Sequence, residues 1–332
     1  MTEQTRTAHT QTELPDIALS PDSADPALQP RLVVTDLDGS LLDHHSYDFS
    51  PAAPWLARLK QQGVPVIPVT SKTRAELISL REALGLTATP FVAENGAVIG
   101  LPPGWCHARL DRPGSGLDGV VVKHTGVDVG FIRARLNVWR KRLGVRFTRM
   151  SELDITQVMA LTGLDEPRAK AARKREGSEP LIWEDDEAAL ANFRLALEGD
   201  GLTLTQGGRF WHVMGKASDK GSAVDWLIKR FTALRGRAPL SLGLGDGPND
   251  ISMLDAVDQA VVIKGCHDLT VTPTNTALYR TKETGPTGWA EGVAHWWGRD
   301  ERRLATAEKG DAVVGEPFFN QEQFDESREA SA

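Results

Sequence analysis

The sequence predicts an α/β fold in which a doubly wound parallel sheet carries an inserted segment of α+β character. Apolar runs of strand length alternate with helical stretches in residues 30–109 and again in residues 215–299. Several of these runs end directly in polar side chains, as expected where ligands gather at the carboxyl ends of parallel strands. Residues 110–214 differ, because short strands, helices and a hairpin follow one another there.

The first half predicts strand, helix, strand, helix, strand. The apolar run 32–35 is a buried strand, and Ser50 should cap a helix over 51–62 that has Pro51 at its first position. The remaining elements are a strand at 64–69, a helix at 74–84, a strand at 91–94, an Asn95-Gly96 turn and a returning strand at 97–99.

The middle segment, 110–214, begins near a hinge at 113–116 and continues with a strand at 120–123. Helical spacing predicts that Ile132, Leu136, Trp139 and Leu143 are core residues. A basic helix follows, and its side chains either form a solvated face or meet an anionic substrate: Arg168, Lys170, Arg173, Lys174 and Arg175. The remaining elements are a strand at 181–183, a helix with Leu190, Phe193 and Leu197 on one face, and a hairpin of 202–205 with 210–214 around 206–209.

The α/β pattern resumes at about 216. A helix opens at Asp219-Lys220-Gly221 and extends to about Leu234. A strand at 240–244 ends in another group of carboxylates, a short helix covers 249–254, and 260–263 is expected to be the last core strand. We expect residues 1–29 to be a disordered arm and 300–332 to be a loose, polar and acidic tail.

Composition limits the possible functions. The chain has 332 residues, enough for two domains, and its net charge of -7 argues against general binding to nucleic acid or to anionic membranes. Only two cysteines occur, Cys106 and Cys266, so no disulfide framework is expected and a cytoplasmic location fits. Neither a membrane-spanning run nor a secretory signal is expected.

Two carboxylates, Asp36 and Asp38, stand at the end of the first strand and are followed by Gly39 and a hydroxyl at Ser40. Crowded carboxylates resist burial unless a cation joins them, and an oxygen-rich pocket suits Mg²⁺. A turn with two solvated Asp residues is the simpler interpretation of such a pair. Other polar groups at or near strand ends favour a site instead: Thr70, Ser71, Lys220, Asp246, Asn249 and Asp250.

In this order the motifs resemble the haloacid dehalogenase-like phosphatase superfamily, with Ser40 where Thr is usual. Further stretches resemble its mannosyl-3-phosphoglycerate phosphatase family. These stretches cover 68–73, 94–96, 175–180, 207–212 and 245–250, within a similarity that extends over about 31–295. Gly247 replaces a commoner Ser, and Gly177 replaces a commoner aromatic residue. The resemblance implies a Rossmann-like core, 30–109 and 215–299, with an inserted α+β cap at 110–214.

The resemblance also implies a mechanism. Asp36 becomes an aspartyl phosphate, Asp38 acts as acid and then base, Thr70 or Ser71 donates a hydrogen bond to the phosphate, and Lys220 supplies a positive charge. The implied Mg²⁺ site uses Asp36, Asp38 through its main-chain carbonyl, Asp246, Asn249 and Asp250. The implied phosphate- and substrate-binding residues are Ser71, Lys72, Glu94, Asn95, Arg175, Ser178, Glu179, Arg209 and His212.

Structural roles remain as alternatives for several of these residues. Lys220 could cap a surface helix, and Asp250 could be a favourable charge at a helix N-terminus. In the implied cap, His212 could be a packed side chain, Glu179 could pair with an arginine, and Trp211 is expected to be core rather than a sugar platform.

The substrate implied by the resemblance is mannosyl-3-phosphoglycerate or its glucosyl counterpart, and the product would be a glycosylglycerate, a compatible solute. The residues do not separate the two sugars, nor do they fix an oligomeric state. A phosphomannomutase-like phosphotransferase, a broader sugar-phosphate phosphatase and a catalytically silent sugar-phosphate sensor are the alternatives. Asp36, Asp38 and Asp246 together favour an enzyme over the sensor.

Overall fold

The structure, a computed structural model, describes residues 29–111, 119–207, 210–265 and 270–311. Several expectations lie outside the described residues: residues 1–28 of the expected arm over 1–29, the hinge at 113–116, Arg209, Cys266 and the last part of the polar tail. The chain divides into two compact units, 1–292 and 293–332.

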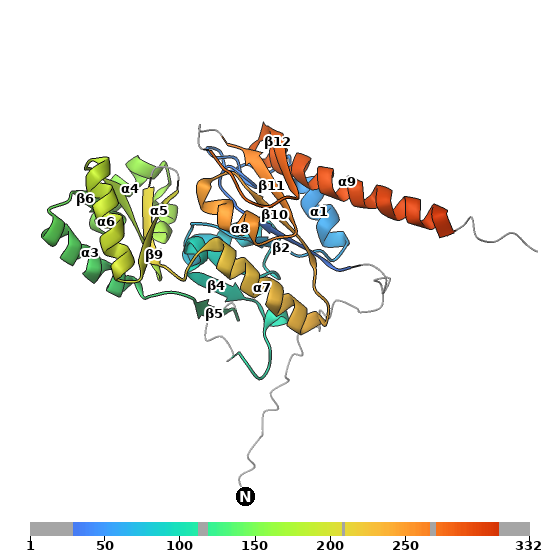
Figure 1. Cartoon of the computed structure of the whole chain (residues 1–332), viewed down its shortest axis with the longest axis horizontal. Helices are drawn as coiled ribbons and strands as arrows, with labels where there is room; N and C mark the ends of the chain where they lie inside the picture. Colours follow the sequence, from blue (N-terminus) through green and yellow to red (C-terminus); the bar gives the residue numbers. More distant parts are fainter. Residues whose placement is uncertain (1–28, 112–118, 208–209, 266–269, 312–332) are drawn as a thin grey trace, which may run out of the picture. The chain divides into compact units, whose positions relative to one another are not determined.

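A five-stranded parallel sheet forms the centre of the first unit (Figure 1). Its order is β12-β11-β10-β1-β2, and every neighbouring pair is parallel. The α/β prediction with a parallel sheet is therefore confirmed. The strands are β1 (Arg31–Thr35), β2 (Val66–Pro68), β10 (Leu240–Gly245), β11 (Gln259–Lys264) and β12 (Leu278–Thr284). The prediction that 260–263 is the last core strand is wrong, because β12 pairs beyond it.

Helices accompany this sheet. They are α1 (Ala53–Gln61), α2 (Arg74–Ala83), α7 (Lys220–Arg235), α8 (Ile251–Asp255) and α9 (Gly285–Asp311). Helix α1 begins later than predicted, at Ala53 with Ala52 as its N-cap, so Ser50 does not cap it. Helix α9 was not predicted, and it makes the first part of the expected polar tail helical.

A second, antiparallel sheet has the order β3-β4-β5, with β3 (Phe91–Ala93), β4 (Val98–Leu101) and β5 (Val121–His124). A single parallel bridge, Val69 with Val92, connects it to the end of β2. The predicted hairpin turn is present as a 3₁₀ turn over Glu94–Gly96, so Glu94 belongs to the turn rather than to the strand.

A third, antiparallel sheet has the order β6-β7-β9-β8 and lies in the middle of the sequence. Its strands are β6 (Phe147–Arg149), β7 (Ser178–Trp183), β8 (Leu202–Gly207) and β9 (Phe210–Gly215). The helices of this region are α3 (Val129–Leu143), α4 (Ile155–Thr162), α5 (Glu166–Ala172) and α6 (Glu187–Gly199).

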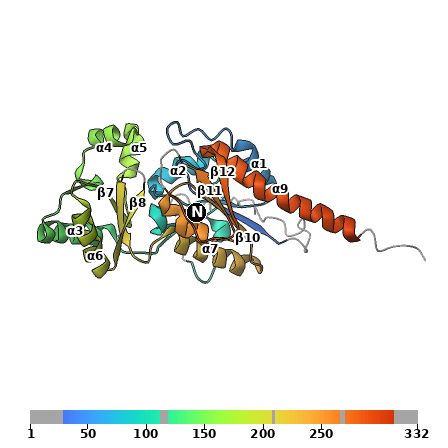
Figure 2. The same cartoon turned by 45° about the horizontal axis from the view of Figure 1, so that its top comes forward.

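Helices α3 and α6 cover one face of this third sheet (Figure 2). Ile132, Leu136 and Phe193 pack there against Leu181 and Val213, so alternate residues of β7 and β9 remain for the opposite face. Two expectations for this region are wrong. Leu143 is 40% exposed because it lies at the last position of α3. Arg173, Lys174 and Arg175 follow α5 instead of lying within it.

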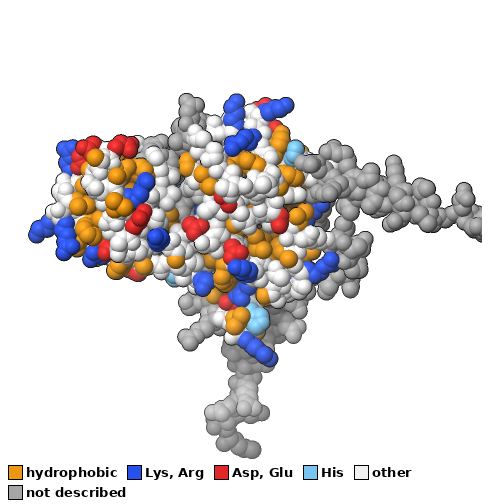
Figure 3. Space-filling model, viewed as in Figure 1, with side chains coloured by type: hydrophobic (Ala, Val, Ile, Leu, Met, Phe, Trp, Pro, Cys, Tyr) orange, Lys and Arg blue, Asp and Glu red, His pale blue; other side chains and the backbone are white. Residues whose placement is uncertain are grey.

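Figure 3 shows basic and acidic side chains interspersed over the face in view, so the charge on that face is mixed rather than of one sign. Within the described residues, no helix combines the length and apolar character needed to cross a membrane.

Candidate active site

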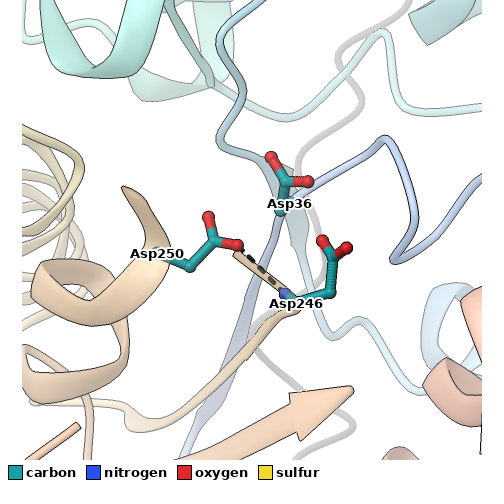
Figure 4. Close-up of side chains that lie close together, drawn as sticks. All are labelled: Asp36, Asp246 and Asp250. Carbon is teal, nitrogen blue, oxygen red and sulfur yellow. Dashed lines mark hydrogen bonds between the residues drawn. The ribbon is translucent and has the colours of Figure 1, made fainter. Parts of the chain in front are cut away.

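The ends of β1 and β10 bring two carboxylates together. These strands are parallel neighbours with Thr35 opposite Leu244, and the N–H of Asp36 donates to the Leu244 carbonyl at 2.9 Å. Asp36 and Asp246, which directly follow the two strands, therefore leave the sheet side by side. Asp36, Asp246 and Asp250 each offer a carboxylate oxygen, and these oxygens lie within 4.8 Å of one another (Figure 4).

Gly39 lets the loop after β1 approach Asp246. Its φ of +78° is favourable only for glycine, and a Cβ at this position would lie 2.5 Å from Asp246 Oδ2. The next residue, Ser40, is fully buried and donates its hydroxyl to Asp246 Oδ1 at 3.1 Å. The absence of a side chain at Gly39 and the hydroxyl of Ser40 together set the position of Asp246.

Gly39→Ala is expected to lower the free energy of unfolding by about 2–3 kcal/mol, because it adds left-handed strain and a clash. Gly63→Ala is the matched control, since Gly63 has a φ of +67° but nothing within 4 Å of an added Cβ. The control should lose about 1 kcal/mol, from backbone strain alone. Urea unfolding of both variants measures the difference, and equal losses would contradict the close approach to Asp246.

Lys220 is a fully buried ammonium between two carboxylates. Its Nζ lies 2.6 Å from Asp36 Oδ1 and 2.6 Å from Asp250 Oδ1. It is the first residue of α7, and Asp219 caps that helix by accepting the N–H of Ser222. Burial alone lowers the pKa of Lys220, but the charges of Asp250 and Asp36 outweigh burial and hold the pKa above its usual value. The alternative of a surface helix residue is therefore wrong.

Asp250 organises the loop after β10. Its Oδ2 accepts the backbone N–H of Asp246 at 3.0 Å (Figure 4). The same oxygen accepts the N–H of Gly247 at 2.9 Å, and Oδ1 accepts from Lys220. Both of its oxygens are therefore engaged, whereas Asp36 and Asp246 each retain an oxygen for which no hydrogen bond is formed among the described residues. This division suits Asp250 to positioning and the other two to direct ligation.

Crowding raises the pKa of these carboxyl groups. Burial raises the pKa of Asp36 well above its usual value, and the charges of Asp250, Asp246 and Asp38 add to burial while Lys220 opposes it. Burial and the charge of Asp250 raise the pKa of Asp246 to about 7. A hard divalent cation, which prefers oxygen ligands, would relieve this repulsion, so the donor set fits such an ion.

Asp38 is paired with Lys72, a residue expected to contact substrate. Lys72 Nζ lies 2.8 Å from Asp38 Oδ2 and 4.8 Å from the centre of the Tyr47 ring. The other oxygen, Asp38 Oδ1, is buried and has no hydrogen-bond partner within the described part of the chain. Tyr47 was not singled out from the sequence, and its φ of +59° is uncommon for a tyrosine, so no local pattern indicates it.

The predicted phosphate loop lies next to Asp38. Thr70 is buried, and its Oγ1 accepts the N–H of Lys72 at 3.2 Å, which leaves the hydroxyl proton free to be donated. Ser71 is partly exposed, and its carbonyl accepts a hydrogen bond from Arg175 Nη1 at 2.8 Å. Arg175 therefore contacts this loop through a main-chain oxygen.

Glu94 and Asn95 follow β3 and are buried beside these loops. Among the described residues, the Glu94 carboxylate accepts hydrogen bonds only from 176–178, including one from the Ser178 hydroxyl at 2.6 Å. Asn95 Oδ1 accepts from Asn249 Nδ2 at 3.2 Å, whereas the buried Asn95 Nδ2 has no partner among the described residues. Glu94 is therefore engaged with the protein, while Asn95 retains a free donor.

Two family models match parts of this chain. One, described as haloacid dehalogenase-like hydrolase, matches residues 33–105, which include Asp36, Asp38 and Thr70. The other, described as sucrose-6F-phosphate phosphohydrolase, matches residues 182–297, which include Lys220 and Asp246. The matches support a haloacid dehalogenase-like hydrolase.

Solved structures show the same fold as this chain. A Thermoplasma acidophilum protein covers 81% of the chain and 98% of its own, with a TM-score of 0.58 and 19% identity. A phosphatase of the haloalkanoate enzyme superfamily from Bacteroides thetaiotaomicron covers 83% and 98%, with a TM-score of 0.57 and 18% identity. A subclass IIB sugar phosphatase covers 80% and 98%, with a TM-score of 0.56 and 15% identity.

The third sheet, in the middle of the sequence, carries the remaining expected residues. Glu179 is fully buried, pairs with Arg133 at 2.5 Å and accepts the N–H of Ser151 at 2.9 Å, which matches the arginine-pairing alternative. Trp211 packs with the cluster under α3 and α6, as expected for a core residue. The ion pair to Arg133 had no local sequence signal, because Arg133 lies on α3, far from Glu179 in the chain.

His212 lies on β9, on the face opposite that cluster, and is only 4% exposed. Its Nδ1 is buried without a hydrogen-bond partner in the described part of the chain. Burial, followed by the charges of Arg175 and Lys220, lowers the pKa of His212 to about 3. The imidazole is therefore neutral at physiological pH.

This neutral imidazole predicts a loss of stability in acid. Between pH 6.5 and about 3 the unfolded chain binds a proton at this residue and the folded chain does not, so the free energy of unfolding falls as the pH is lowered. By pH 5 the contribution is about 2 kcal/mol. Urea unfolding at pH 7 and at pH 5 measures how much unfolding free energy is lost between the two, and His212→Gln should make that loss smaller by this amount. An unchanged loss of stability in His212→Gln would contradict the prediction.

Proposed function

We propose that the chain is a Mg²⁺-dependent phosphatase that hydrolyses a sugar phosphate through an aspartyl phosphate on Asp36. The observation that carries the proposal is the Asp36 carboxylate at the end of β1, held by Lys220 and lying beside Asp246. A nucleophilic carboxylate can approach an anionic phosphate only when it is held in position and when positive charge nearby offsets part of the negative charge. The two family models and the sugar phosphatase of the same fold support this reaction class.

In the first step one Asp36 oxygen forms a bond to phosphorus, and the bond from phosphorus to the substrate oxygen breaks. Asp38, protonated for this step, gives its proton to the departing oxygen, and Thr70 donates a hydrogen bond to the phosphate. In the second step Asp38 takes a proton from water, which attacks phosphorus and releases phosphate with Asp36 restored. Lys72 fixes the direction of the Asp38 carboxylate throughout.

Asp36, Asp246 and the main-chain carbonyl of Asp38 would hold the Mg²⁺ ion, and Asn249 and Asp250 would orient these ligands. When bound, the ion reduces the repulsion between the phosphate and the carboxylates and stabilises charge in the transition state. Lys220 also offsets negative charge at the site, because its ammonium donates to Asp36 Oδ1.

We further propose that 110–214 forms a cap over a core made of 30–109 and 215–299. The separate third sheet supports this division. The contacts of residues 171–178 with the loops after β2 and β3 support a cap that lies at the site. Substrate selection would then fall to cap residues such as Arg175 and His212, with a contribution from Arg209.

For the substrate we propose mannosyl-3-phosphoglycerate or glucosyl-3-phosphoglycerate, which gives a glycosylglycerate as a cytoplasmic compatible solute. The motifs at 175–180, 207–212 and 245–250 support this choice. Sucrose phosphate, or a broader range of sugar phosphates, is the second candidate, because the match over 182–297 is to a sucrose-phosphate phosphohydrolase. A phosphomannomutase-like transfer would use the same nucleophile and differ only in the acceptor.

Phosphate release with Mg²⁺ tests the substrate. The panel contains mannosyl- and glucosyl-3-phosphoglycerate, free 3-phosphoglycerate, sucrose 6-phosphate and hexose phosphates. Strong preference for one glycosyl phosphoglycerate supports the first candidate, and preference for sucrose phosphate or broad activity supports the second. Transfer of phosphate to an added sugar instead of water would identify a phosphotransferase, and no release from any phosphate monoester would overturn the proposed reaction.

A further inference from the structure

The turn after β3 holds an unusual backbone conformation. Glu94, Asn95 and Gly96 have φ values of 53°, 54° and 108° in succession. Left-handed conformations are unfavourable for a non-glycine residue and persist where surrounding contacts enforce them. The contacts that enforce this turn come from several segments far apart in the sequence.

Glu94 connects the turn to the segment 176–178. Its fully buried carboxylate accepts the N–H of Glu176 at 2.8 Å, the N–H of Gly177 at 3.1 Å and the Ser178 hydroxyl at 2.6 Å. No ion pair of Glu94 is formed within the described residues. These three hydrogen bonds therefore compensate a buried negative charge, and they exist only while the segment is docked.

Gly177 makes this close docking possible. A Cβ at this position would lie 2.7 Å from the Cβ of Ala97, the residue that follows the turn. The segment therefore lies directly on the turn, with no space for a side chain between them. This contact gives a physical reason for a glycine at 177 in this chain.

The other side of the turn touches three of the proposed catalytic loops. The N–H of Asn95 donates to the Thr70 carbonyl at 2.9 Å, and its Oδ1 accepts from Asn249. A Cβ on Gly96 would lie 2.3 Å from the carbonyl oxygen of Asp219, the residue before Lys220. A shift of this turn would therefore move the surroundings of Thr70, Asn249 and Lys220 together.

We propose that Glu94 is a positioning residue that couples docking of the 176–178 segment to the alignment of the catalytic groups. The inference rests on the proposed phosphatase function and adds a means by which the middle region of the chain controls the rate. Docking supplies the donors that Glu94 requires, Glu94 holds the strained turn, and the turn sets the loops of Thr70, Asn249 and Lys220. Glu94 itself does not touch the substrate.

Glu94→Gln is the most selective variant, because glutamine keeps the shape of the glutamate side chain but replaces one of its two acceptor oxygens with a donor. A glutamine places an NH₂ donor against the N–H or O–H donors of 176–178, so one side of the contact becomes repulsive. Gly177→Ala disturbs the same docking by a different route, since it adds a methyl group and leaves the charge unchanged. Glu176→Gln is the matched control, because it removes an adjacent carboxylate whose partners, Arg74 and His124, lie nearer the surface.

The kinetic test uses p-nitrophenyl phosphate, a small substrate with no sugar to contact the middle region. We expect Glu94→Gln and Gly177→Ala to lower kcat by about 10–100-fold with little change in KM, because misaligned groups slow the chemistry. Glu176→Gln should stay within about twofold. An unchanged kcat in Glu94→Gln, or an equal loss in Glu176→Gln, would overturn the assignment to Glu94.

Amide hydrogen exchange tests the coupling without any turnover. In Glu94→Gln the amides of Asn95 and Gly221, which donate to Thr70 and Ser252, should exchange faster along with those of 176–178. Faster exchange confined to 176–178 would show that docking of this segment does not affect the alignment of the catalytic loops, and would contradict the proposal. A wild-type protein without phosphatase activity would count against the proposed function alone, because the exchange result still decides the coupling.

Discussion

Asp36→Asn is expected to lower kcat for phosphate release by about 10⁴-fold or more. The amide has the shape of the carboxylate but cannot form the bond to phosphorus. The substitution also removes one charge from a crowded group whose burial already raises the pKa of Asp36, so the metal-free protein should not lose stability. Activity with a saturating sugar phosphate and thermal unfolding, measured side by side, give both quantities.

Acid quenching provides the control for this variant. Wild-type protein mixed with substrate and quenched in acid should carry phosphate on the peptide that contains Asp36, and Asp36→Asn should carry none. Activity above about 1% of the wild type in a folded Asp36→Asn protein would mean that another group is the nucleophile. Phosphate found on a different peptide would lead to the same conclusion.

Lys220→Met is expected to have the largest effect on stability. It leaves Asp36 and Asp250 buried without their shared cation, and breaking a buried ion pair in this way costs about 3–5 kcal/mol of the free energy of unfolding. Activity should fall by about 10³-fold, because the charge beside the nucleophile is lost. Urea unfolding and steady-state rates at pH 8, where the remaining carboxyl groups are driven toward ionisation, measure both effects.

Lys229→Met is the matched control on the same helix. Lys229 is 73% exposed and pairs with Asp225 one turn away, so its loss should cost no more than about 0.5 kcal/mol and leave the rate unchanged. Similar losses in the two variants would show that a lysine on α7 matters for the helix in general. The assignment of Lys220 to the buried carboxylates would then be wrong.

The central strands were predictable because their chemistry is local. Strand β1 is an apolar run that ends at Asp36, and β10 repeats the pattern before Asp246, so strand and site were apparent together. Strand β12 lacks such a run: it lies at the edge of the sheet, and most of its residues are partly or fully exposed. Helix α9 was missed for a different reason: its fully buried Trp289, which donates to Thr35, stands among Gly285, Gly288 and Gly292, and glycines are poor helix formers.

The members of the candidate site were predictable, but their pairings were not. Each of Asp38, Lys72 and Glu94 belongs to a motif that can be seen in the sequence. That Lys72 holds Asp38, and that Glu94 receives the 176–178 segment, depends on segments far apart in the chain being packed together. Hydrogen bonds of this kind leave no local pattern, so a role at the site could be inferred while the partner could not.

The parallel pairing of β1 with β10 bears on how the protein matures as it leaves the ribosome. Arg31 lies opposite Leu240, so the strand that carries Asp36 is synthesised long before its neighbour on that side exists. Until then, one edge of an apolar strand is open to aggregation or chaperone capture, and closing so long a loop makes folding slow. We therefore expect soluble yield to depend on translation speed and temperature, and nascent chains that stop short of Gly245 to have no catalytic centre.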